Sequence, residues 1–109
     1  MTQSSPEEYL AALAQIRDAA QQRAFISKAR NPPNQSLVEA VSTKIRELLP
    51  RDLDLAEIFS ETNLYIASLI DTAISRAYAT RARAQVLYTR RKCAEADPIF
   101  AEAVELFDK

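Results

Sequence analysis

The chain has 109 residues, of which 48% are hydrophobic and 27% charged, and it contains neither glycine nor histidine. The absence of glycine excludes phosphate-binding loops that need positive φ or close backbone approach, and the absence of histidine removes the commonest general base and a common metal ligand. The formal net charge of −1 gives no global attraction for nucleic acid or a membrane. Alanine is the commonest residue and has the best helix propensity. We therefore expect a single all-α domain over 1–109, not an enzyme, with no cofactor and no metal.

The ends and the cysteine usage indicate a cellular location. Cys93 is the one cysteine of the sequence, so no disulfide can form within the chain. The first residues lack the basic and apolar stretches of a signal peptide, and charges interrupt every apolar run before it could span a membrane. We expect a soluble, cytoplasmic protein with no membrane partner.

The first predicted helix covers residues 6–30. Ser5 can cap it, Pro6 suits its first position, and Glu8 lies three residues after the cap. The prolines at 32 and 33 must end it. One face carries the apolar residues at helical spacing, which are Tyr9, Leu13, Ile16 and Ala20.

The sequence predicts two further helices within residues 36–70. Ser36 and Glu39 form a second capping box, and Pro50 ends this helix. Either Asp52 or Asp54 can cap the next helix, which continues to about residue 70.

Two more helices are predicted over 72–92 and 94–107, which makes five in total. Asp71 can cap the first of them, although no glycine or proline forces a break there, so that one continuous helix is the alternative. Asp97 and Pro98 suit the first turn of the last helix, where the missing N–H of proline is not needed.

The last third of the chain carries small and aromatic residues at a recurring spacing. They are Ala84, Leu87, Tyr88, Ala96, Phe100, Ala103 and Leu106. This pattern resembles the helix pair of a tetratricopeptide repeat, in which an A-x3-F sequence marks the second helix. Arg91 departs from it, because the repeat has glycine in that turn. The sequence of residues 58–61 is similar to that of residues 99–102. We therefore interpret 36–70 as a diverged earlier helix pair, in which Phe59 takes the role of Phe100.

The resemblance implies a right-handed helical repeat within a small helical bundle, from a larger protein of a kind known in bacteria. Such repeats act as scaffolds that bind a protein or peptide partner in a concave groove. The stripe Ala73, Ala77, Thr80, Ala84 and Leu87 would pack on the last helix. The neighbouring stripe would line the groove, with candidate binding residues Tyr78, Arg81, Gln85, Tyr88 and Thr89. The alternative is that Ile74, Tyr78 and Tyr88 are core residues.

Two other functional classes remain open. The cations between residues 72 and 92 could contact nucleic acid; they are Arg76, Arg81, Arg83, Arg90, Arg91 and Lys92. Acidic residues in the following helix balance their charge, so nucleic acid is the less favoured partner. Apolar residues on the last helix could instead pair two chains in a self-associating structural domain, a homo-oligomer. Cys93 is interpreted as a partly buried small residue rather than a reactive thiol.

Overall fold

The computed structural model describes residues 6–28 and 33–108, which form six α-helices and no strand. The all-α prediction is confirmed, but the helix count is six and not five. Three parts of the prediction lie outside the described residues. They are the Ser5 cap, the helix end and proline link within residues 29–32, and Lys109. The helices are α1 (Pro6–Ala14), α2 (Ala19–Ser27), α3 (Gln35–Leu48), α4 (Leu53–Ile70), α5 (Ala73–Thr89) and α6 (Cys93–Phe107).

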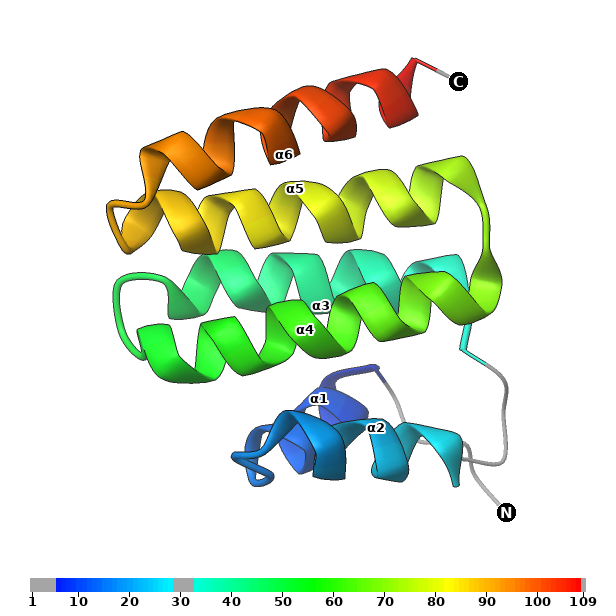
Figure 1. The fold of residues 1–109 in the computed structure, drawn as a ribbon. Coiled ribbons are helices and arrows are strands. Elements are labelled where there is room, and N and C mark those ends of the chain that lie inside the picture. Colours follow the sequence, from blue (N-terminus) through cyan, green and yellow to red (C-terminus); the bar gives the residue numbers. More distant parts are fainter. Residues whose placement is uncertain (1–5, 29–32, 109) are drawn as a thin grey trace.

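The helices stack in layers (Figure 1). Helices α3 and α4 form an antiparallel middle layer, with the short pair α1 and α2 on one side of it. On the other side lies α5, which contacts α3, α4 and α6, and α6 closes that end of the stack. Helix α5 therefore has neighbours on three sides, and α3 and α5 run in the same direction.

The single helix predicted for residues 6–30 is wrong, because the chain breaks at residues 15–18. Asp18 caps the second piece by accepting a hydrogen bond from the backbone N–H of Gln21 at 2.9 Å. The fully buried Gln22 donates from its side-chain amide to the carbonyl oxygens of Leu13 at 3.0 Å and Ile16 at 2.9 Å. These bonds satisfy carbonyls that the end of α1 leaves free. The break also turns Ala20 to the solvent instead of the core.

Polar side chains attach the α1–α2 pair to the middle layer. The amide oxygen of Gln22 accepts a hydrogen bond from the hydroxyl of Thr62 at 2.6 Å, and both residues are fully buried. The guanidinium of Arg17 donates to both carboxylate oxygens of Asp52, at 2.9 and 3.2 Å. The hydroxyls of Ser27 on α2 and Tyr65 on α4 also share a hydrogen bond at 2.8 Å. Helix α4 and its cap thus supply one buried and two exposed polar links to this pair.

Two predicted helix starts change in detail, and a third is decided between two alternatives. Asn34, not Ser36, caps α3 through the N–H of Leu37 at 3.0 Å. Asp52, one of the two alternatives, caps α4. Thr72 caps α5, while Asp71 ends α4 in the left-handed region at φ 56°, so that α4 and α5 are separate helices. Short polar side chains at these turns do what glycine and proline do elsewhere.

The turn between α5 and α6 contains a strained residue. Arg91 has φ 65°, where glycine is favoured, and its N–H donates to the carbonyl of Tyr88 while that of Lys92 donates to Leu87, both at 2.9 Å. This pair of bonds is the Schellman pattern of a helix end. Helix α6 begins at Cys93, so Pro98 lies inside it and not in its first turn as predicted.

The main hydrophobic core lies among α1 to α5. Its largest fully buried members include Phe59, Leu13, Ile45 and Ile66. Helix α5 contributes Ala79, Ala82 and Val86 to this core. The other buried apolar residues of α5 are Ala77, Ala84 and Leu87, which lie outside this core. We assign them, together with Ala96 and Ala103 of α6, to the interface between α5 and α6.

Candidate functional site

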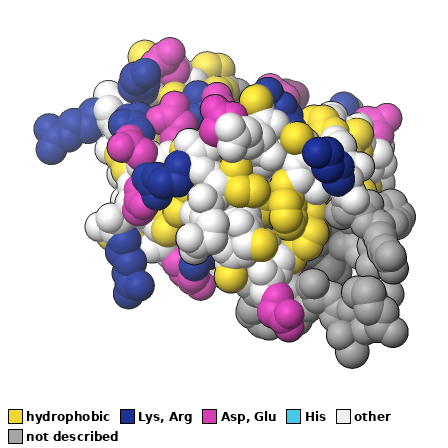
Figure 2. Space-filling model, turned by 90° about the horizontal axis from the view of Figure 1, so that it is seen from below, with side chains coloured by type: hydrophobic (Ala, Val, Ile, Leu, Met, Phe, Trp, Pro, Cys, Tyr) yellow, Lys and Arg dark blue, Asp and Glu magenta, His cyan; other side chains and the backbone are white. Residues whose placement is uncertain are grey.

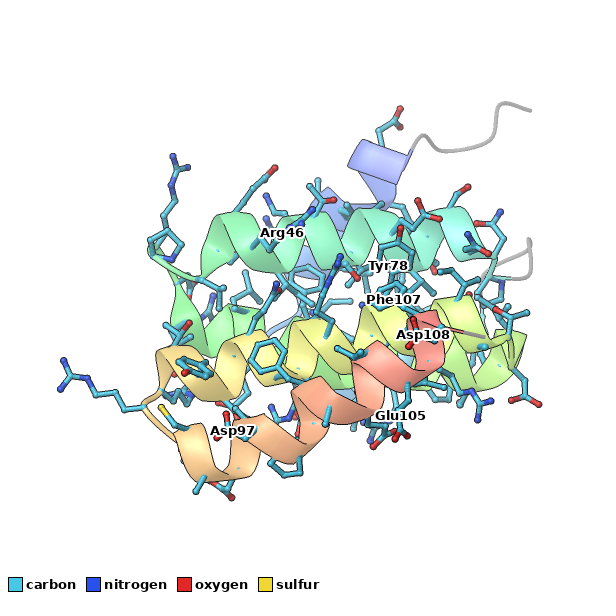
Figure 3. All side chains as sticks on the ribbon, turned by 90° about the horizontal axis from the view of Figure 1, so that it is seen from above. Arg46, Tyr78, Asp97, Glu105, Phe107 and Asp108 are labelled. Atoms are coloured by element: carbon cyan, nitrogen blue, oxygen red, sulfur yellow. The ribbon has the colours of Figure 1, made fainter. Side chains whose placement is uncertain are left out.

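The predicted binding residues lie along α5, between α3 and α6 (Figure 3). Tyr78, Arg81 and Gln85 are half-buried, and Tyr88 is 51% exposed. These four follow one another at helical spacing, so the structure brings them onto one stripe. Tyr78 packs against the main core, as the alternative interpretation expected, whereas Tyr88 lies at the surface.

Thr89 does not belong with the other four residues. Its hydroxyl donates to the carbonyl oxygen of Gln85 in its own helix at 2.9 Å. Its side chain lines an open pocket of about 610 Å³ between the start of α4 and the end of α5, together with Leu53, Glu57, Arg90, Arg91 and Lys92. The charges of Glu57 and Arg90 in this pocket are already paired with each other.

Aromatic residues of α6 pack against the stripe at two points. The rings of Tyr78 and Phe107 meet edge to face with centroids 5.3 Å apart, and those of Tyr88 and Phe100 do so at 5.8 Å. Edge-to-face packing is the favourable geometry for such pairs. The two contacts hold α6 along the stripe at both ends.

Arg81 is held by the first of these aromatic pairs. Its guanidinium carbon lies 5.2 Å from the ring centroid of Tyr78 and 5.2 Å from that of Phe107. A cation above an aromatic face is attracted to the ring quadrupole, which fixes the guanidinium in place. Sequence reasoning did not find Phe107, although it follows Phe100 by two helical turns and therefore lies on the same face of α6.

Helix α3 supplies the opposite side of this surface. The hydroxyl of Ser42 donates to the backbone carbonyl of Tyr78 at 3.5 Å, and the amide of Asn63 donates to Ser42 at 3.0 Å. Arg46 follows Ser42 by one turn and is exposed. Helices α3 and α5 are parallel, and Ser42 lies beside Tyr78. One helical turn further along each helix is Arg46 on α3 and Arg81 on α5, so these two residues lie at about the same level.

We name these residues the α5 surface: Arg46 from α3, Tyr78 and Arg81 from α5, and Phe107 from α6. Figure 3 shows Tyr78 with Arg46 on its α3 side and Phe107 on its α6 side. Three helices that are far apart in sequence therefore contribute to one surface, in which aromatic rings support one cation and a second cation lies beside them.

The arginines of α5 divide into paired and unpaired groups. Arg83 lies 3.6 Å from Glu57, while Arg90 lies 2.7 Å from Asp54 and 2.6 Å from Glu57, so both face the acids of α4. The hydrogen bond that Arg90 donates to Asp54 raises the pKa of Arg90 above its ordinary value. Within residues 6–28 and 33–108, neither Arg81 nor Arg46 lies within ion-pair distance of a carboxylate.

The outer face of α6 is acidic and partly apolar. Val104 is 60% exposed, and Cys93 at the start of this helix is exposed, not partly buried as predicted. Helix α6 and its C-cap carry five exposed acidic residues, which are Glu95, Asp97, Glu102, Glu105 and Asp108. None of these acids forms an ion pair with a described cation.

On the side of the molecule that carries α1 and α2, hydrophobic side chains gather near the middle of the described surface (Figure 2). In the described part of the chain, no group of three or more acidic or cysteine residues is placed to hold a metal ion. None of the described helices is long and apolar enough to cross a bilayer.

No protein-family model matches this sequence, and no curated protein or solved structure matches it either. The geometry of the α5 surface is therefore the basis for a functional proposal.

Proposed function

We propose that the chain is a non-enzymatic protein-interaction module of the tetratricopeptide-like kind, part of a larger protein or assembly, which binds a segment of a partner protein across the α5 surface. The observation that carries this proposal is Arg81. Its guanidinium is fixed by two aromatic rings yet has no carboxylate partner among the described residues. Arg83 and Arg90 of the same segment, by contrast, pair with acids of α4.

The packing of the helices supports the repeat-like part of the proposal. Helices α3 and α4 form one antiparallel pair, α5 and α6 form a second, and α5 contacts both members of the first pair. Stacked helical repeats bury their apolar faces against neighbours in this way. Phe59 and Phe100 have different surroundings, since Phe59 is fully buried and Phe100 packs half-buried on Tyr88.

Affinity capture with three variants tests the proposal. We expect proteins retained by the wild-type chain to be lost with Arg81→Ala and with Tyr78→Ala, because both changes dismantle the stacked arrangement. Arg23→Ala is the matched control, since it removes an arginine from α2 on the far side of the molecule. Partners that bind all four proteins equally would remove the α5 surface from consideration.

Self-association is a second candidate, favoured by the exposed Val104 on the outer face of α6. A symmetric α6 pairing would bring two sets of unpaired acids together, so it would need high salt. Light scattering over a range of protein and salt concentrations tests this candidate, and a monomer under all conditions would exclude it.

Nucleic-acid binding is less favoured, because two of the six cations in the segment 72–92, Arg83 and Arg90, form ion pairs with acidic residues of α4. Titration with duplex and single-stranded DNA at two salt concentrations checks this, since binding to phosphates weakens steeply with salt.

A further inference from the structure

We infer that the segment bound by the α5 surface is acidic, with aspartate or glutamate side chains that pair with Arg81 and Arg46. This inference rests on the proposed function and specifies its partner. The evidence is the arrangement of charge and aromatic rings on this surface.

Arg81 is prepared to bind a carboxylate before any partner arrives. Its guanidinium carbon lies over the faces of the Tyr78 and Phe107 rings, 5.2 Å from each centroid. A guanidinium can form two parallel hydrogen bonds with a carboxylate, and no described carboxylate lies within ion-pair distance of Arg81. Because the rings already restrict the side chain, binding loses less conformational freedom than it does at a free arginine.

Arg46 adds a second cation at the same level of the surface. Among the described residues, its side chain donates a hydrogen bond to Thr43 of its own helix at 3.4 Å. An acidic segment that crosses from α6 toward α3 would meet Arg81 and then Arg46.

The acids nearest this surface along the chain do not fill the role. Glu47, next to Arg46, lies 3.9 Å from Lys44, and Glu39 accepts a hydrogen bond from Gln35 at 2.8 Å. Asp108 follows Phe107 as the cap of α6. None of these three acids lies within ion-pair distance of Arg46 or Arg81. The described chain therefore leaves both cations for an external carboxylate.

An acidic peptide fits this surface better than a nucleic acid does. Base recognition needs open aromatic faces for stacking. Here the rings of Tyr78 and Phe107 meet each other edge to face, and Arg81 lies over both of them. The guanidinium groups themselves can pair with carboxylates or with phosphates, so the peptide and DNA experiments below separate these two kinds of partner.

Selection from a random dodecapeptide library displayed on phage tests the inference without a known partner. We expect the wild-type chain to enrich peptides rich in aspartate and glutamate. Synthetic copies of these peptides should bind at least about tenfold more weakly to Arg81→Gln and to Arg46→Gln, because each change removes a charge-assisted hydrogen bond. Binding should also weaken at high salt, and copies with asparagine and glutamine in place of the acids should fail to bind.

Arg23→Gln is the matched control, since it makes the same charge change on α2 and should leave binding unchanged. Circular dichroism checks that each variant is folded, and the exposed Arg46→Gln provides the test if Arg81→Gln unfolds. Enriched peptides that lack acidic residues but bind more weakly to Arg81→Gln would overturn the inference and leave the interaction function in place. Binding unaffected by both variants, no enrichment at all, or selective binding of single-stranded DNA would overturn both.

Discussion

The two outer helix pairs attach to the central α3–α4 layer by different combinations of contacts. The α1–α2 pair places Leu10, Leu13 and Ile26 in the main core and is fixed further by polar links, among them the buried Gln22–Thr62 hydrogen bond and the exposed Arg17–Asp52 ion pair. The α5–α6 pair relies more on small side chains, because α5 buries alanines toward both the main core and α6, in addition to the ion pairs of its arginines with α4. Small residues let helices approach closely, whereas hydrogen bonds fix position at a few points.

This difference bears on function because the α5 surface depends on close packing. The contacts of Tyr78 and Arg81 with Phe107 exist only where α6 lies directly along α5. A looser attachment like that of α1 and α2 would not hold these rings in register. We therefore expect substitutions at the α5–α6 interface to disturb both stability and binding, and substitutions around α1 and α2 to disturb stability alone.

The largest expected effect is that of Ala84→Leu, which breaks the close approach of α5 and α6. Ala84 is fully buried, so the extra carbon atoms have no space, and overpacking of this kind costs up to about 3 kcal/mol. Denaturant unfolding measures the loss. Ala101→Leu on the exposed face of α6 is the control and should change stability by less than about 0.5 kcal/mol. Equal effects from the two changes would contradict close packing at Ala84.

Gln22→Ala tests the polar attachment of the other pair. The change leaves the Leu13 carbonyl and the Thr62 hydroxyl without this partner, which costs about 2 kcal/mol of unfolding free energy. Amide hydrogen exchange should accelerate in α1 and α2, while α5 and α6 remain protected. Uniform acceleration along the chain would show that the two pairs are not independently attached.

Arg91→Gly should stabilise the turn that sets the position of α6. A non-glycine residue in the left-handed region costs about 1 to 2 kcal/mol, and the greater freedom of glycine in the unfolded chain offsets part of the gain. We expect a net gain of about 0.5 to 1 kcal/mol in thermal or denaturant unfolding. A loss of stability would mean that the arginine side chain contributes more than its backbone costs.

Acid titration isolates the exposed link between α1–α2 and the central layer. The hydrogen bond from Arg17 and, next, that from the Leu55 N–H lower the pKa of Asp52 below its ordinary value. The folded state therefore holds this proton less tightly than the unfolded state, so the stabilisation is present at neutral pH and is lost as the pH falls below about 4.

The Asp52→Asn variant should show a shallower decline in stability over that acidic range than the wild type. Asp97→Asn is the control, because Asp97 is exposed and has no ion pair with a described residue. Identical acid profiles for wild type and Asp52→Asn would show that the Arg17 link contributes nothing.

Local sequence signals predicted the helices best where a single residue ends a helix. Pro50 gave the end of α3, and the spacing of apolar residues gave the extents of α4 and α5. The break after α1 was missed because the apolar spacing continues through it. The signal was present in Asp18 and Gln21, which have the spacing of a helix cap and its partner. The role of Gln22 depends on Thr62, forty residues further on, and no local pattern reveals such a contact.

The candidate site was predictable in part for the same reason. Helical spacing alone placed Tyr78, Arg81, Gln85 and Tyr88 on one stripe. The contributions of Arg46 and Phe107 follow from how α3 and α6 cross α5, which is a property of the packed structure. Thr89 was misplaced because its own-helix hydrogen bond and the pocket beside α4 are invisible to that spacing.

The most direct test of the account is a nuclear magnetic resonance titration of the isotope-labelled chain with a selected acidic peptide. The account predicts that amide shifts concentrate at residues 42–46 of α3, 78–85 of α5 and 103–108 of α6, and that Arg81→Gln reduces them. Shifts concentrated on α1 and α2, or on the outer face of α6 around Val104, would contradict it.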